Sequence, residues 1–148
     1  MVPLTVKFFT PGVDVLAVAP VYSFTQNTTK SGSTAITQLS GITPGTYDIT
    51  VKSNHTLTNV KLSVVISQNP TAVSMGTLLE GNAKEDTAGN ALIISGADFS
   101  TLSLTWNKVP GDPGFNANAD FDLNGIVSGG DFSLLSLNWN KIQPVTVP

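Results

Sequence analysis

The chain has no cysteine, no arginine and no long apolar run, and each absence excludes a class of protein. Without cysteine it has neither disulfides nor thiolate metal sites. Its seven lysines are outnumbered by ten acidic residues. It therefore lacks the concentrated positive charge that binds phosphate backbones, and we expect no nucleic-acid partner. Its apolar stretches are all too short for a membrane span.

The N-terminus also lacks a secretory signal, because Met1 is followed directly by Val2 and Pro3, with neither a basic flank nor an apolar core. The abundance of serine, threonine, asparagine and glycine is nevertheless typical of an exposed extracellular β protein. We therefore expect a segment excised from a longer precursor, located outside the cell or on its surface. A native intracellular start at Met1 is the alternative.

Segments of alternating apolar and polar residues fill the first half of the chain. Tyr47, Ile49 and Val51 alternate with polar neighbours, which gives one buried and one wet face. Turn signals such as Pro44-Gly45 separate the segments. The predicted strands are 4–9, 13–19, 21–26, 33–39, 46–53, 59–67 and 71–79. They predict an N-terminal domain, residues 1–79, that is an antiparallel β-sandwich of six or seven strands.

The stretch LSGITPGTYDITVKS, residues 39–53, resembles the prealbumin-like or carboxypeptidase-regulatory-like sandwiches, which are accessory modules of extracellular proteins. The resemblance implies a spacer or stabilising role rather than catalysis. The only histidine, His55, has neither a cysteine nor a recognisable serine–carboxylate pair with which it could form a nucleophilic catalytic site. We therefore expect no enzymatic activity.

From about residue 80 onward a repeat replaces the strand pattern. DFSTLSLTWNK (98–108) and DFSLLSLNWNK (131–141) are identical at nine of eleven positions and begin 33 residues apart. Each places phenylalanine, leucine and tryptophan at i, i+3 and i+7, which is one face of a helix. Because a short helix cannot bury such a stripe alone, we expect the two stripes to pack on each other. Residues 80–148 are therefore predicted to form an α-helical lobe of two loop–helix units with an extended tail.

The stretch DFDLNGIVSGGD, residues 120–131, directly precedes the second helix and has the ligand spacing of a calcium loop. Acidic or amide side chains stand first, third, fifth and twelfth, with serine ninth and glycine sixth for the sharp turn. Hard oxygen donors in this number suit Ca²⁺ and argue against zinc or copper. A metal-free turn that caps the helix is the alternative. The predicted ligands are the side chains of Asp120, Asp122, Asn124, Ser128 and Asp131 and the backbone carbonyl of Ile126, whose side chain is expected to pack inward.

The first repeat carries a degenerate version of this loop. IISGADF (93–99) aligns with IVSGGDF (126–132). The alignment makes Ile93, Ser95 and Asp98 the equivalents of the last three ligands. These three residues are therefore predicted to contribute to a second calcium site.

Upstream of those residues two alignments remain open. One alignment places Asn82 at the first position of the loop and Asp86 at the fifth. Lys84 then stands at the third position, where its positive charge would repel a cation. The other starts at Asp86, with Asn90 fifth and Ala88, which has no ligand atom, third. Both alignments keep Asp86 and Asn90 near the ion. Whether this loop binds calcium or is metal-free stays open.

A duplicated loop that has only an exiting helix resembles the type I dockerin module, over about residues 80–142. The resemblance implies the calcium-folded half of a cohesin–dockerin pair, hence a non-catalytic attachment module with a cohesin-like partner. Dockerins contact cohesin through loop positions ten and eleven, here the small pairs 96–97 and 129–130, and through exposed helix faces. The candidate partner contacts are Leu104, Leu137, Lys108 and Lys141.

Two alternatives concern these contacts and the partner. The two leucines could instead pack against the sandwich. The extended termini, VPLTVKFF and IQPVTVP, could add to the sheet of a neighbouring copy. The chain would then be a structural subunit of an extracellular filament or surface layer.

Overall fold

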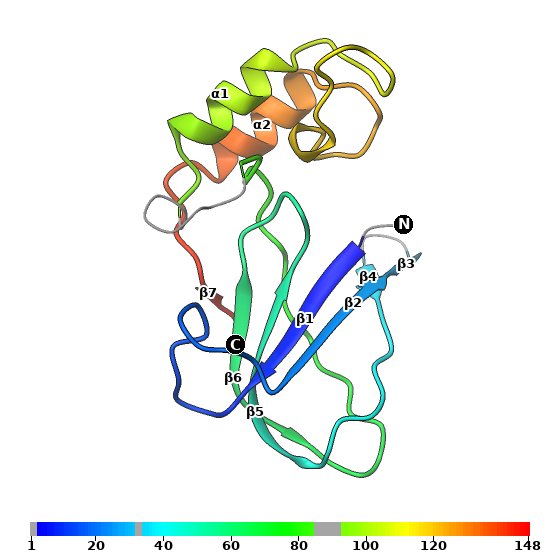
Figure 1. Ribbon diagram of the computed structural model, residues 1–148, viewed down its shortest axis with the longest axis vertical. Coiled ribbons are helices and arrows are strands. Elements are labelled where there is room, and N and C mark those ends of the chain that lie inside the picture. The colour runs from blue at the N-terminus through cyan, green and yellow to red at the C-terminus, as the bar shows by residue number, and fades with distance from the viewer. Residues whose placement is uncertain (1–2, 32–33, 85–92) are drawn as a thin grey trace. The chain divides into compact units, whose positions relative to one another are not determined.

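The computed structural model describes residues 3–31, 34–84 and 93–148 (Figure 1). The chain forms two compact units. The sheet unit comprises residues 1–53, 58–77 and 144–148, and the helix unit comprises residues 54–57 and 78–143. The predicted division of the chain into two consecutive domains, 1–79 and 80–148, stays a prediction.

Five strands form one mixed sheet in the sheet unit (Figure 1), in the order β2-β1-β5-β6-β7. They are β1 (Pro3–Phe9), β2 (Tyr22–Asn27), β5 (Gly45–Lys52), β6 (Asn59–Ile66) and β7 (Val145–Thr146). Neighbouring strands are antiparallel except β6 and β7, which run parallel. A separate antiparallel pair is formed by β3 (Thr29–Ser31) and β4 (Thr34–Ile36).

The predicted antiparallel β-sandwich of six or seven strands is therefore wrong. The sheet unit has a single large sheet, and that sheet is mixed because the C-terminal tail supplies β7. Two predicted strands, 13–19 and 71–79, do not form. Alternation indicates which side chains are buried, but it does not establish that a segment finds a neighbouring strand to pair with.

Side-chain hydrogen bonds account for both missing strands. The Asp14 carboxylate accepts a hydrogen bond from the Leu16 amide (3.0 Å), which holds this segment in a local turn. Further along the chain, the buried Asn59 amide donates to the carbonyls of Met75 and Thr77 (2.8 and 2.9 Å). That segment is thus held by a side chain instead of by a strand ladder.

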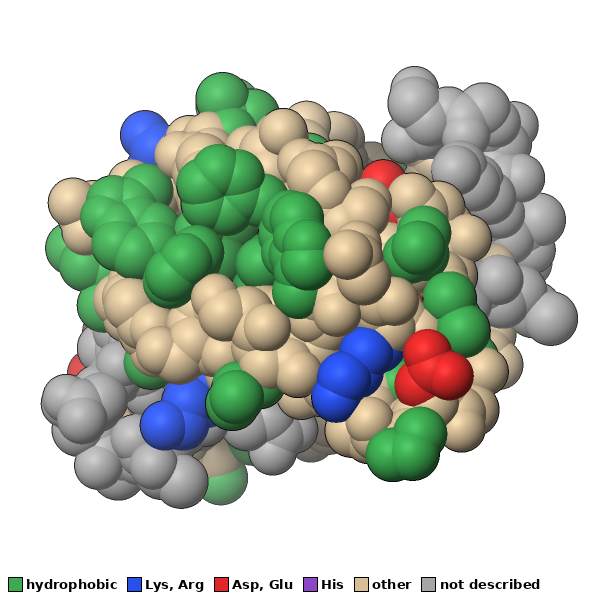
Figure 2. All heavy atoms as spheres, turned by 90° about the horizontal axis from the view of Figure 1, so that it is seen from above, with side chains coloured by type: hydrophobic (Ala, Val, Ile, Leu, Met, Phe, Trp, Pro, Cys, Tyr) green, Lys and Arg blue, Asp and Glu red, His purple; other side chains and the backbone are tan. Residues whose placement is uncertain are grey.

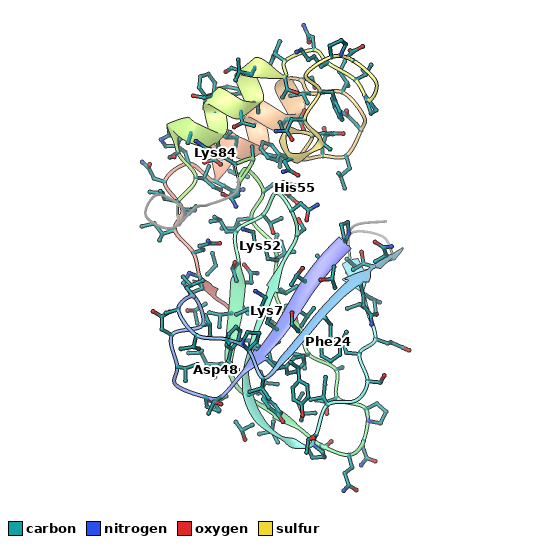
Figure 3. All side chains as sticks on the ribbon, viewed as in Figure 1. Lys7, Phe24, Asp48, Lys52, His55 and Lys84 are labelled. Atoms are coloured by element: carbon teal, nitrogen blue, oxygen red, sulfur yellow. The ribbon has the colours of Figure 1, made fainter. Side chains whose placement is uncertain are left out.

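The core of the sheet unit is built from alternate residues of its central strands. Phe8 packs edge-on against Tyr22 and Tyr47, with ring centroids 6.2 and 5.7 Å apart. Full burial of one such side chain contributes about 1.5–3 kcal/mol. Asp48 (Figure 3) is also buried, and its carboxylate accepts the amides of Gly12 and Ser63. The buried apolar side chains of the three central strands are Leu4, Val6, Phe8, Phe9, Ile49, Val51, Val60 and Val64.

The expectation of an α-helical dockerin-like lobe is wrong as well. The described part of the helix unit has two nine-residue helices, α1 (Gly96–Leu104) and α2 (Gly129–Leu137), and one 3₁₀ turn, η1 (Ala117–Ala119). Its other described residues are loops and isolated bridges. Each helix is short because an asparagine three residues beyond its end, Asn107 or Asn140, takes a positive φ of 58° or 61°.

The two apolar stripes are only partly buried. Leu102 and Leu135 are fully buried, and the rings of Phe99 and Phe132 meet 6.0 Å apart. Both phenylalanines, and the tryptophans one further turn along each stripe, remain substantially exposed. The contact between the phenylalanine rings agrees with the prediction that the two stripes pack on each other, but only the leucines of the stripes are buried. In the described residues, no helix has the length and apolar character to cross a membrane.

Candidate metal centre

Three carboxylates converge in the loop that precedes α2. Asp120, Asp122 and Asp131 each offer an oxygen, and these oxygens all lie within 4.8 Å of one another. Asp120 and Asp131 are buried, whereas Asp122 is exposed. Like charges at this separation repel by about 3–4 kcal/mol per pair at an effective dielectric near 20. The arrangement therefore has a strong electrostatic demand for a cation.

The N-terminal part of the loop is ordered by its own first side chain. The Asp120 carboxylate accepts the amides of Asn124 (3.1 Å) and Gly125 (3.0 Å). Gly125 adopts φ +87°, a conformation that costs glycine little. The Asn124 side chain in turn donates to Asp122 (2.9 Å) and accepts from the Ile126 amide (2.8 Å). These contacts bring Asp120, Asp122 and Asn124 together as the spacing predicted.

Asp131 closes the loop from the first turn of α2. Its Oδ1 accepts the Phe121 amide (2.6 Å), and its Oδ2 accepts the amide of Ser128 (2.8 Å), the helix N-cap. The positive end of the helix dipole also favours a carboxylate at this position. One side chain thus caps the helix and ties both ends of the loop to it.

The remaining two predicted ligands lie at the end of the loop. Ser128 is half-buried at the helix N-cap. The Ile126 side chain is exposed, so the expectation that it packs inward is wrong. The next residue, Val127, is the buried one. This placement leaves the role of the Ile126 carbonyl as a prediction.

The first loop has the same closure. Asp98 is buried, and its carboxylate accepts the amides of Lys84 (3.1 Å) and Ser95 (2.8 Å). In the second loop the amide of Asp122, the third loop position, also donates to Asp131 Oδ1 (3.3 Å). Placing Lys84 third by the same contact agrees with the alignment that starts at Asn82. Ile93 is half-buried and forms a β-bridge with Ile142. The predicted ligands Asp86 and Asn90 lie outside the described residues.

Asn82 is the notable residue of the first loop. Its side chain is only 1% exposed, and within the described residues neither its Oδ1 nor its Nδ2 has a hydrogen-bond partner. A buried amide without partners costs about 1–3 kcal/mol. An oxygen donor in this state, at the first loop position, is well suited to a cation.

The two repeats hold each other in a reciprocal arrangement. Val127 of the second loop exchanges backbone hydrogen bonds with residues 107 and 108, just beyond α1 (2.8 and 3.2 Å). Ile94 of the first loop does the same with residues 140 and 141, just beyond α2 (3.0 and 3.1 Å). Both side chains are fully buried. Each loop is therefore supported by the helix end of the other repeat.

Sequence reasoning missed a pair formed by the buried His55 and the half-buried Glu80. The Nδ1 of His55 lies 2.5 Å from Oε2 of Glu80. Burial raises the pKa of the Glu80 carboxyl, and the neighbouring histidine partly offsets this rise. The backbone carbonyl of His55 also accepts a hydrogen bond from the backbone amide of Asn82. The His55 ring packs against the Phe121 ring, with centroids 6.1 Å apart. No local pattern could reveal the pair, because its members are 25 residues apart.

The predicted partner contacts are exposed. Leu104 and Leu137, at equivalent positions of the two helices, are 78% and 75% exposed. Lys141 is exposed, whereas Lys108 donates to the Pro113 carbonyl (2.9 Å). Neither helix has a charged residue besides its buried aspartate. Apolar side chains accordingly gather on this surface with few charges among them (Figure 2).

Comparisons with known proteins show likeness in fold only. No protein-family model matches the chain, and no curated protein matches it. Two chains in crystal structures of a type II cohesin–X–dockerin complex from Acetivibrio cellulolyticus, carrying interface mutations, are similar with TM-scores of 0.57. In the C-terminal interface mutant, the match is 17% identical and covers 69% of this chain and 67% of that chain. In the N-terminal interface mutant, it is 16% identical and covers 94% and 81%.

Proposed function

We propose that this chain is a non-catalytic, calcium-binding docking module of an extracellular or cell-surface protein. The observation that carries the proposal is the convergence of Asp120, Asp122 and Asp131, whose oxygens lie within 4.8 Å of one another. Such a cluster repels itself unless a cation is bound. Cation binding would therefore contribute folding free energy to a small unit.

Calcium suits this donor set better than other metals. Flexible loops rich in carboxylate and carbonyl oxygen accommodate the six to eight ligands that Ca²⁺ prefers. The only nearby imidazole, His55, is paired with Glu80. In the second loop the cation would be held by Asp120, Asp122, Asn124, Ile126, Ser128 and Asp131.

A second cation at the first loop is supported by two features. Asp98 repeats the closure made by Asp131, and the Asn82 side chain is buried without a partner among the described residues. Ile93 and Ser95 would supply the remaining donors, with Asp86 and Asn90. Because Lys84 replaces an aspartate, we expect this site to be the weaker one.

The docking role is supported by the uncharged surface of α1 and α2 and by the fold comparison. Leu104 and Leu137 project from equivalent positions, as anchors of a protein interface do. The similar complexes contain a cohesin and an X–dockerin component. The duplicated loop–helix favours a cohesin-type partner, contacted also by Lys108 and Lys141, and a dockerin-type partner is the other outcome to test.

Calorimetric titration of the full chain with Ca²⁺, after removal of divalent ions, tests the proposal. We expect one tight site and a weaker second one, with the tight site lost in Asp120→Asn. A panel of cohesin and dockerin domains, with and without chelator, then tests the partner. Absence of calcium binding would overturn the metal assignment. Binding of calcium without binding to either panel would remove the docking role alone.

A further inference from the structure

The second metal loop contains the only Asn-Gly pair of the chain, Asn124-Gly125. The Asn124 side chain is exposed to solvent. Because glycine has no β-carbon, its backbone nitrogen can approach the preceding side-chain amide more closely than that of any other residue. An exposed asparagine before glycine is therefore the chemical setting in which amide loss is fastest.

The folded loop holds both reacting groups in other contacts. The Gly125 amide, which is the nucleophile, donates to Asp120 Oδ2 (3.0 Å). The Asn124 side chain donates to Asp122 Oδ2 (2.9 Å) and accepts from the Ile126 amide (2.8 Å). All three of these partners, Asp120, Asp122 and Ile126, belong to the proposed calcium site. Any loosening of the site would free the nucleophile and its target together.

We propose that Asn124 is a deamidation site whose rate is controlled by the cation in the loop. This inference rests on the proposed calcium function. The Gly125 nitrogen loses its proton and bonds to Cγ of Asn124, and the side-chain nitrogen leaves as ammonia. One water molecule then opens the cyclic imide at either carbonyl. The products at position 124 are aspartate or isoaspartate.

The two products differ in their effect on the loop. Aspartate keeps an oxygen donor at the fifth position and adds a negative charge. Isoaspartate lengthens the main chain by one carbon between Asn124 and Gly125, which breaks the paired contacts that both amides make with Asp120. The isoaspartate product therefore lowers calcium affinity irreversibly, whereas the aspartate product does not.

The test uses the full chain, kept at 37 °C in mildly alkaline buffer with either Ca²⁺ or a chelator. Peptide mass mapping measures the mass gain at position 124, and enzymatic methylation measures isoaspartate. We expect at least about tenfold faster conversion in chelator, because the reaction requires local opening of the loop. Equal rates in the two conditions, or no conversion in either, would overturn the inference.

Two controls keep the result specific. Exposed Asn107 and Asn140, which precede lysine, should stay unmodified in the same digests. The variant Asn124→Asp should show no mass gain at this peptide, because its side chain has no amide to lose. Calorimetry on fresh protein separates the two claims. A chain that binds calcium but deamidates at equal rates refutes only this inference, whereas a chain that binds no calcium refutes the proposed function as well.

Discussion

Gly130 lies so close to Asp122 that a β-carbon at this position would come within 2.7 Å of the Asp122 Oδ2 atom. The absence of a side chain at loop position eleven thus leaves room for a carboxylate of the metal site. Gly129, one residue earlier, has open space around it. Of the two glycines, only Gly130 therefore has a local steric role in the loop.

This relationship makes the first prediction. Gly130→Ala should displace the flexible Asp122 carboxylate and lower calcium affinity about tenfold, with little loss of stability because alanine favours the helix. Calorimetry of the variant with Ca²⁺ measures the effect. The matched control, Gly129→Ala, should bind as the wild type does. Equal affinities for the two variants would contradict the role of Asp122 as a ligand.

The second prediction concerns the closure of the loop. Asp131→Ala leaves the Phe121 and Ser128 amides without their acceptor and removes a proposed calcium ligand, so the free energy of unfolding at saturating Ca²⁺ should fall by about 2–4 kcal/mol. Urea denaturation measures the change. Asp14→Ala, which removes one exposed acceptor, should cost less than about 1 kcal/mol. A loss of that small size at Asp131 would show that the closure does not stabilise the fold.

A third prediction tests the docking surface. Because Leu104 and Leu137 are exposed, the double variant Leu104→Ala/Leu137→Ala should leave stability within about 0.5 kcal/mol of the wild type. It should weaken partner binding about tenfold or more. Leu62→Ala, an exposed leucine of β6, is the control that should not affect binding. Unchanged affinity in the double variant would place the interface elsewhere.

The pair of buried His55 and half-buried Glu80 predicts a pH dependence of stability. Because burial raises the folded pKa of Glu80, its protonated form is favoured in the fold. Glu80 thus stabilises the protein fully below its ordinary value of 4.5, and this contribution is lost as the pH rises through the higher folded value. In chelator, Glu80→Gln should flatten the profile of unfolding free energy from pH 4.5 upward. Urea denaturation midpoints at a series of pH values measure both profiles. Identical profiles for Glu80→Gln and the wild type would contradict this prediction.

The candidate site could be predicted from sequence because its determinants are local. The ligand spacing of residues 120–131 and the glycine at 125 lie within twelve consecutive positions. The repeat identified Asp98 as the equivalent of Asp131 in the first loop. The sheet could not be predicted, since β7 pairs with β6 across nearly 80 residues of chain. Alternation in residues 13–19 and 71–79 reflected partial burial, while Asp14 and Asn59 hydrogen bonds decided their conformation.

Long-range pairs were missed for the same reason. His55 stands in a stretch that reads as a turn, and nothing near it in sequence indicates a buried carboxylate partner. The alignment made Asn82 a candidate ligand, but its burial without partners among the described residues could be learned only from the fold. Local spacing thus predicts which carboxylates of residues 120–131 lie close together, whereas strand order and polar pairs such as His55 and Glu80 depend on contacts between distant segments.

A crystal structure of the chain grown with Ca²⁺ tests the central claim most directly. The account predicts anomalous density for a cation in the second loop, with the oxygens of Asp120, Asp122, Asn124 and Asp131 at about 2.3–2.6 Å from it. A loop that keeps its three carboxylates together around water alone, at saturating Ca²⁺, would contradict the account.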